Sequence, residues 1–238
     1  MIIAANFKTN KSRRQTAEYY KEVSNYIDNN SISSDAMIFP PSTALDSFEG
    51  KISVGAQNAY AVENGAFTGE IGLDQLDEFG IKTILIGHSE RRHILGESQE
   101  LIVQKFNYFK EQGFTIVYCI GEPLEVREEG SEALMNYLDD QLDGIDLDYA
   151  NLIIAYEPVW AIGTGLTPSE DEVKSIHTAL RQKIACPILY GGSVKTSNAK
   201  ELLALDNVDG ALIGSGALNV DDYCTILEIA ENITKDNK

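Results

Sequence analysis

The sequence has few cysteines and no long apolar run, and both scarcities exclude classes of protein. The three cysteines are widely separated and form no Cys-x-x-Cys pair; they are Cys119, Cys186 and Cys224. This spacing argues against a disulfide framework or a zinc knuckle and favours a reducing, cytoplasmic compartment. No stretch approaches the roughly 18 apolar residues of a membrane span. Residues 1–6 lead directly into an apolar segment without a basic region, so we expect no secretory signal.

Basic residues are also scarce relative to acidic ones. The chain of 238 residues carries 19 Lys and Arg against 37 Asp and Glu, a formal net charge of −18. Nucleic acids and anionic membranes bind positive surfaces, so we expect neither as a partner. A small anionic substrate is compatible with this charge, because backbone N–H groups and one or two cations can bind phosphate locally.

Short apolar runs alternate with amphipathic segments along the chain. The runs have the length of buried strands and occur at residues 2–5, 36–39, 52–55, 83–86, 115–119, 152–156, 187–190 and 208–213. Between them, three sets of residues share one face at helical spacing: Thr16, Tyr19, Tyr20, Val23 and Ile27; Leu134, Tyr137, Leu138 and Leu142; Val173, Ile176, Leu180 and Ile184. Thr167 to Glu170 has the form of a capping box with Pro168 at the first helical position, and predicts a helix start there.

Eight strands with intervening helices indicate an α/β fold. A single-domain (β/α)8 barrel over residues 1–238 fits the length, and an open doubly wound sheet fits the pattern as well. No Gly-, Ser- or Pro-rich linker divides the chain. The longest connection without a helical pattern, residues 57–69, carries Tyr60, Val62 and Phe67, which are costly to leave in water. We interpret it as a partner-binding loop.

The stretch 153–166 joins a buried strand to an acid and a loop. Glu157 stands where the strand ends, and Pro158 blocks its continuation. Gly163 and Gly165 give the following apolar segment the freedom of a loop that closes over a ligand. An ordinary strand-to-helix connection with a solvated Glu157 fits the same pattern. Because barrel active sites lie at the carboxyl ends of strands, Glu157 is a candidate base.

Polar side chains follow two other predicted strands. Asn6 and Lys8 stand two residues apart after the first, a spacing that places both on one face of an extended segment. His88 follows the fourth, at an expected helix start whose dipole favours the neutral ring, which can donate a hydrogen bond. Glu90 either ties Lys8 in place or belongs to a charge cluster at the helix start. The other two histidines are interpreted as structural; they are His93 and His177.

Glycine-rich turns follow the last two predicted strands, at residues 190–194 (YGGSV) and 212–218 (LIGSGAL). Each precedes an expected helix. Barrels commonly bind phosphate with backbone N–H groups of the loops after strands seven and eight. Taken together, the two turns predict a phosphate site.

Six segments, in this order and spacing, closely resemble the triosephosphate isomerase family: NFKTN, AQNAYAVENGAFTGEI, ILIGHSERR, YEPVWAIGTG, YGGSV and LIGSGAL. The resemblance covers essentially the whole chain and is most specific around His88 and Glu157. It implies a cofactor-free and metal-free homodimer that interconverts dihydroxyacetone phosphate and glyceraldehyde 3-phosphate in glycolysis and gluconeogenesis.

The resemblance also implies roles for single residues. Glu157 would be the base, His88 the neutral electrophile, and Lys8 and Asn6 would stabilise the substrate oxygens. Glu90 and Cys119 would support these groups, and Thr68 would reach the neighbouring subunit. The implied phosphate-binding residues are Gly163, Ser193, Gly214 and Ser215. The chain departs from the usual family pattern at Phe7, Thr9, Leu166 and Ser215, none of which replaces a catalytic group.

Two other functions remain open at this point. Another sugar-phosphate isomerase or epimerase would share the phosphate turns but not GHSERR followed by YEPVWAIGTG. A non-catalytic or moonlighting barrel that serves as a binding module would not need every candidate catalytic residue, and this chain retains them all.

Overall fold

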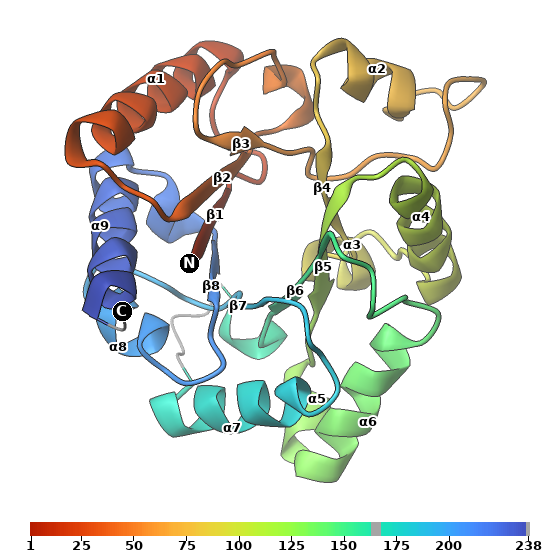
Figure 1. Cartoon of the computed structure of the whole chain (residues 1–238). Coiled ribbons are helices and arrows are strands. Elements are labelled where there is room, and N and C mark those ends of the chain that lie inside the picture. Colours follow the sequence, from red (N-terminus) through yellow and green to blue (C-terminus); the bar gives the residue numbers. More distant parts are fainter. Residues whose placement is uncertain (163–167, 237–238) are drawn as a thin grey trace.

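The computed structural model describes residues 1–162 and 168–236 and folds them into a barrel of parallel strands inside a ring of helices (Figure 1). The strands run in the order β3-β2-β1-β8-β7-β6-β5-β4. Their bounds are β1 Ile2–Asn6, β2 Asp35–Phe39, β3 Ser53–Val54, β4 Thr83–Ile86, β5 Thr115–Ile120, β6 Leu152–Tyr156, β7 Ile188–Tyr190 and β8 Gly210–Ile213. All eight predicted strands are therefore present within one or two residues of their expected bounds.

The barrel closes between β3 and β4 through one residue that follows β3. Ala56 forms a parallel bridge with Ile84. Its N–H donates to Thr83 O, and its carbonyl accepts from Leu85 N, each at 2.9 Å. The (β/α)8 barrel is thus confirmed, and the open doubly wound sheet is excluded.

Helices cover the outside of the strands. They are α1 Arg13–Asn30, α2 Leu73–Glu78, α3 Ser89–His93, α4 Gln99–Glu111, α5 Leu124–Glu128, α6 Ser131–Leu142, α7 Glu170–Arg181, α8 Ala199–Leu203 and α9 Val220–Asp236. Three short 3-10 turns complete the described elements: η1 Ser42–Ala44, η2 Val159–Ala161 and η3 Ser215–Ala217. Within the described ranges, none of these helices has both the length and the apolar character needed to cross a bilayer.

Alternation along the strands divides the core into two layers. Side chains such as Ala4, Val117 and Leu189 form a small cluster inside the barrel, whereas their strand neighbours pack outward against the helices. The predicted inner face of α1 is buried throughout, as expected. On the other two predicted faces, Tyr137 of α6 and Ile176 of α7 are only half-buried.

The start of α7 differs from the sequence prediction. The N-cap is Ser169, and its capping box closes on Glu172: Ser169 N donates to Glu172 Oε2 at 2.7 Å, and Glu172 N donates to Ser169 Oγ at 3.3 Å. Both Thr167 to Glu170 and Ser169 to Glu172 have the required spacing. The later pair places three acidic residues in the first turn, where the helix dipole favours negative charge. Pro168 therefore precedes the cap, and the predicted start was wrong by two residues.

Candidate active site

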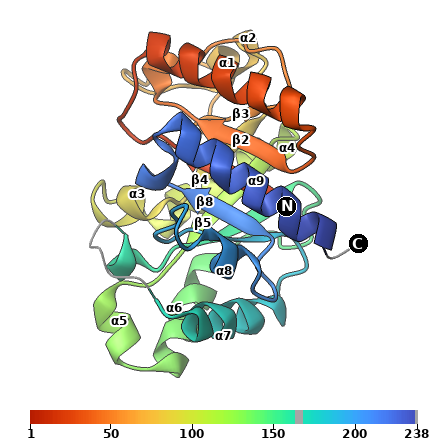
Figure 2. The ribbon, with the colours of Figure 1, turned by 90° about the vertical axis from the view of Figure 1, so that its left-hand side faces the viewer.

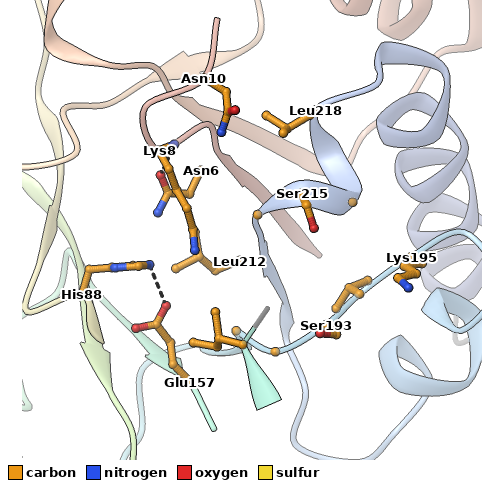
Figure 3. Close-up of a pocket in the computed structure, with 16 residues that line it drawn as sticks. Asn6, Lys8, Asn10, His88, Glu157, Ser193, Lys195, Leu212, Ser215 and Leu218 are labelled. Carbon is orange, nitrogen blue, oxygen red and sulfur yellow. Dashed lines mark hydrogen bonds and ion pairs between the residues drawn. The ribbon is translucent and has the colours of Figure 1, made fainter. Parts of the chain in front are cut away.

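The carboxyl ends of the strands surround a cavity at one end of the barrel. In Figure 2 the start of β1 and the end of α9 lie at one end, and α3 lies at the other, where the strands terminate. The cavity encloses about 180 Å³, and seven of the eight catalytic and phosphate-binding candidates line it: Asn6, Lys8, His88, Glu157, Ser193, Gly214 and Ser215 (Figure 3). The eighth, Gly163, lies outside the described residues, as does the departure at Leu166.

Glu157 follows β6 directly and is buried. Its Oε1 lies 3.0 Å from His88 Nε2, and its Oε2 accepts from Ser89 N at 3.0 Å. Burial raises the pKa of this carboxyl, but the His88 ring, the Ser89 N–H and the nearby Lys8 lower it, and the net shift is downward. The group is therefore a carboxylate, the form that can accept a proton.

His88 caps the N-terminus of α3 with its ring. Its Nδ1 accepts from Glu90 N at 3.2 Å, so the ring proton lies on Nε2 and points at Glu157. Burial lowers the pKa of His88, whereas the facing Glu157 carboxylate raises it, and the net shift is upward. A protonated ring would direct an N–H at the Glu90 amide, however, and lose that bond. The capping geometry is compatible with a neutral ring, and the neutral state of His88 stays a prediction from the sequence.

Lys8 is held in an uncommon backbone conformation. Its φ is +51°, in the left-handed region that residues other than glycine rarely occupy. Lys8 N donates to Asn6 Oδ1 at 3.0 Å, Lys8 O accepts from Gln57 Nε2 at 2.8 Å, and Nζ lies 2.6 Å from Glu90 Oε1. The ion pair with Glu90 settles one question left open by the sequence: Glu90 does tie Lys8 in place. Gln57 was not identified from the sequence, where it only opens a long connection.

Cys119 lies in β5, paired in register with Ala155 of β6, and is fully buried. Burial and the neighbouring Glu157 carboxylate both raise the pKa of its thiol well above the ordinary value. The thiol therefore stays protonated beside the Glu157 carboxylate.

The turns after β7 and β8 bring main chain to the other side of the cavity. Ser193 donates its hydroxyl to Ala161 O at 3.1 Å, and Gly214 leads into η3 at Ser215. Gly191 allows a close approach, since a Cβ there would lie 2.7 Å from Glu157 Cγ. Lys195 also lines the cavity and was missed, although it directly follows the YGGSV turn.

The described part of the predicted loop is anchored at its start. Trp160 of η2 donates its Nε1–H to Glu122 Oε1 at 2.9 Å, and Tyr156 donates its hydroxyl to the same oxygen at 3.1 Å. Arg127 lies over the Trp160 ring at 4.5 Å. Neither Glu122 nor Arg127 was identified from the sequence, because Glu122 lies between β5 and α5 and Arg127 lies in α5, both far in sequence from the segment that they hold.

None of the remaining histidines and cysteines lines the cavity; they are His93, His177, Cys186 and Cys224. His177 is buried, its Nδ1 lies 3.0 Å from Asn207 O, and burial lowers its pKa to about 4, so it is neutral. Cys119, Cys186 and Cys224 are free thiols. Among the residues that the structure describes, no three His, Cys, Asp or Glu side chains are grouped so that they could hold a metal ion.

The fold and the site together define a (β/α)8 barrel that presents a buried carboxylate, an imidazole N–H and an ammonium group to a small cavity. Comparison with known proteins gives the family. A family model of triosephosphate isomerase matches residues 1–230. Curated triosephosphate isomerases are similar along the full chain: that of Sulfurimonas denitrificans is 58% identical over 238 residues, covering 100% of this chain and 99% of that protein. That of Wolinella succinogenes is 54% identical over 230 residues, 96% of this chain and 99% of that protein. The chain belongs to the triosephosphate isomerase family, as the resemblance predicted.

Proposed function

We propose that this protein interconverts dihydroxyacetone phosphate and D-glyceraldehyde 3-phosphate by proton transfer through an enediolate. Family membership makes it an intramolecular aldose–ketose isomerase and favours the triose phosphate reaction over the epimerase and binding-module alternatives. The observation that carries the proposal is the meeting of the Glu157 carboxylate, the His88 Nε2–H and Lys8 in one cavity. The reaction moves hydrogen within one molecule, so no redox cofactor enters its balance.

Glu157 is the proposed base. The proton that must move lies next to a carbonyl and is weakly acidic, so a positioned carboxylate needs help from groups that stabilise the resulting oxyanion. Both oxygens of Glu157 are hydrogen-bonded to protein, at His88 and Ser89. Substrate must therefore take over the contact with His88, which frees one carboxylate oxygen to accept the proton and return it to the adjacent carbon.

The side chains proposed to stabilise the developing enediolate are those of His88, Lys8 and Asn6. His88 donates from Nε2, because its Nδ1 is occupied by the Glu90 amide. Lys8 supplies a positive charge, held by the Glu90 carboxylate and by a backbone that Asn6 fixes. Donors that are already in place when negative charge forms lower the barrier more than donors that must reorient.

The phosphate group is proposed to bind at the turns after β7 and β8. Ser193, Gly214 and Ser215 line the cavity, and Figure 3 shows Ser193 and Ser215 on the opposite side from Glu157. Gly163 is assigned to the same site by the resemblance. Main-chain N–H groups in such turns bind anions. Apolar side chains at Ile162 and Leu212 line the same cavity and exclude water from it.

A coupled spectrophotometric assay of the purified chain tests the proposal. Turnover of both triose phosphates is expected, with no turnover of pentose phosphates and no loss of activity after exhaustive treatment with a chelator. A protein that binds triose phosphates without turning them over would overturn the enzymatic function. Turnover of pentose phosphates at a comparable rate would instead favour the epimerase or isomerase alternative.

We also propose that the protein is a cytoplasmic homodimer that meets its partner through residues 57–72 and the segment after α3. Thr68 lies on the first segment beside Phe67, whose ring is 42% exposed; Ile94 and Leu95 on the second are 75% and 64% exposed. Large apolar side chains left in water on one chain mark a contact surface. A second copy of the chain is the proposed occupant, in line with the homodimer that the family resemblance implies.

The expected variant effect at this surface is dissociation. T68R places a charge in the proposed contact and is expected to shift the protein from dimer to monomer in light scattering and sedimentation. T225R, on the exposed side of α9, is the matched control and is expected to remain dimeric. A parent chain that is monomeric at micromolar concentration contradicts the proposal.

A further inference from the structure

The end of β5 lies between the strand that carries Glu157 and the strand that leads to His88. Main-chain bonds from this end hold the base: Ile120 O accepts from Glu157 N at 2.7 Å, and Glu122 O accepts from Val159 N at 3.1 Å. Gly121, between them, packs so closely that a Cβ there would lie 1.7 Å from Glu157 O. The main chain at residues 120–122 therefore determines where the Glu157 backbone sits.

The N–H and C=O groups of Gly121 are hydrogen-bonded to a side chain and not to a neighbouring strand. The ladder between β4 and β5 ends at the pair Ile86 and Tyr118, before Gly121 is reached. There the buried side chain of Gln141, from α6, accepts Gly121 N–H at 2.8 Å with Oε1 and donates from Nε2 to Gly121 O at 3.1 Å. A primary amide carries the same donor and acceptor as a peptide group, so Gln141 replaces the missing strand neighbour.

Gln141 is itself held in place by hydrogen bonds to residues that connect it to the backbone before His88. Its main-chain oxygen accepts from Tyr118 Oη at 2.6 Å and from Gln99 Nε2 at 2.9 Å. Arg92 continues the network, with one guanidinium N–H on Gln99 Oε1 at 2.8 Å and another on Gly87 O at 2.7 Å. Gly87 directly precedes His88, so one chain of hydrogen bonds joins the backbones that carry the base and the electrophile.

We propose that Gln141 is a positioning residue for proton transfer, which clamps the Gly121 peptide and thereby sets the place of Glu157 relative to His88. This inference rests on the proposed function and on Glu157 as its base. Gln141 does not line the cavity, so it acts through main chain and not on substrate. Its loss therefore affects the chemical step, which depends steeply on geometry, more than phosphate binding, which uses other turns.

Replacement of the clamp by an apolar side chain gives the first test. Q141L is expected to lower kcat about 10- to 100-fold and to change KM less than about threefold, because misplacement of a reacting group by about 1 Å can cost 100-fold in rate. Y149F is the matched control at the opposite end of β5, where the Tyr149 hydroxyl donates to Phe114 O at 2.8 Å. It also removes a side-chain bond to main chain, and is expected to lower stability while kcat stays within about twofold.

A second variant distinguishes positioning from general stability. In Q141E the protonated carboxyl can make both bonds to Gly121, whereas the ionised form would repel Gly121 O. The kcat of Q141E is therefore expected to fall with rising pH in a step that the parent lacks. A parallel pH profile of Q141E and parent would overturn the inference, even if Q141L does not fold.

Failure of this inference is distinguishable from failure of the proposed function. An inactive parent chain would overturn the proposed function itself. An active parent, with kcat of Q141L within about twofold of it, or with a raised KM and an unchanged kcat, would overturn only the role of Gln141.

Discussion

The two ends of the cavity are built in different ways. At the reacting end, side chains from β1, β4 and β6 meet, and protein contacts hold each one: Glu157 by Ser89 N–H, His88 by the Glu90 amide, and Lys8 by the Glu90 carboxylate. At the phosphate end, short glycine-containing turns bring main chain to the cavity. Proton transfer requires a group with a suitable pKa in a defined position, which only a particular side chain provides. Phosphate binding requires N–H donors, which the main chain provides whatever the side chain is. Substitutions are therefore expected to be severe at one end and mild at the other.

The largest effect is expected from shortening the base. E157D withdraws the carboxylate by about one bond length and should lower kcat about 100- to 1,000-fold, because proton transfer depends steeply on distance. Binding of a phosphate-bearing substrate analogue, measured by calorimetry, should stay within about threefold, since the phosphate turns are intact. E170D, in the exposed first turn of α7, is the control. Retention of full turnover by E157D would remove the distinction between the two ends.

An intermediate effect is expected where the reacting end is held indirectly. E90Q removes the carboxylate that pairs with Lys8 Nζ at 2.6 Å and should lower kcat/KM about five- to tenfold, a modest loss because the Glu90 side chain is 40% exposed. Steady-state kinetics measure it. D77N breaks the exposed pair of Asp77 with Lys82 at 2.5 Å and serves as control, with no change expected. An E90Q enzyme that matches the parent would show that Lys8 is held by its backbone alone.

The smallest kinetic effect is expected at the phosphate end. S215G removes the side-chain hydroxyl and keeps the main-chain N–H, so KM should change less than about threefold and kcat should not change. The same assay gives the result. A loss of 10-fold or more would mean that the Ser215 hydroxyl binds substrate, and that this end also depends on a specific side chain.

The pKa of Glu157 gives a further test of how the reacting end of the cavity is built. Burial raises the pKa of Glu157, whereas the His88 ring, the Ser89 N–H and the nearby Lys8 lower it, and the net shift is downward. A lowered pKa in the folded protein means that the carboxylate persists to more acidic pH, and that the stabilisation it receives is lost only as pH falls through that lower value. Carbon-13 NMR of the Glu157 carboxyl, assigned with E157Q, should give a midpoint below the ordinary value of about 4.3. A midpoint above about 5 would show that burial outweighs these partners.

Much of the barrel could be predicted from local patterns. The strands are short and buried on both faces, so their residues are mostly apolar, and this pattern can be recognised without knowing which strands are paired. The errors fall where local rules allow two answers or where pairing decides the bounds. The start of α7 has two overlapping capping boxes, and β3 spans only Ser53–Val54 because the barrel closes through a single bridge at Ala56. Only the three-dimensional arrangement selects between such alternatives.

The proposed reacting groups could be predicted from the sequence, as could two of their supports, Glu90 and Cys119, whereas the supports Gln57 and Gln141 could not. Glu157, His88 and Lys8 each stand at a strand end within a distinctive motif, so position in the sequence indicates them. Gln57 and Gln141 act by bonding main chain 49 and 20 residues away. Gln57 lies in one of the six segments that carry the resemblance, but nothing in that segment marks it as a partner of Lys8, and Gln141 lies outside all six. A glutamine that replaces a peptide group leaves no signal in composition or periodicity.

The left-handed backbone of Lys8 has a consequence for how stable this protein can become. A non-glycine residue at φ +51° is strained, and glycine would occupy the same conformation with less strain. The substitution K8G is therefore one that selection for thermostability alone would favour and that selection for catalysis would reject. Any search for stabilised forms of this enzyme that scores folding without turnover will tend to discard Lys8, the cation that we propose stabilises the enediolate.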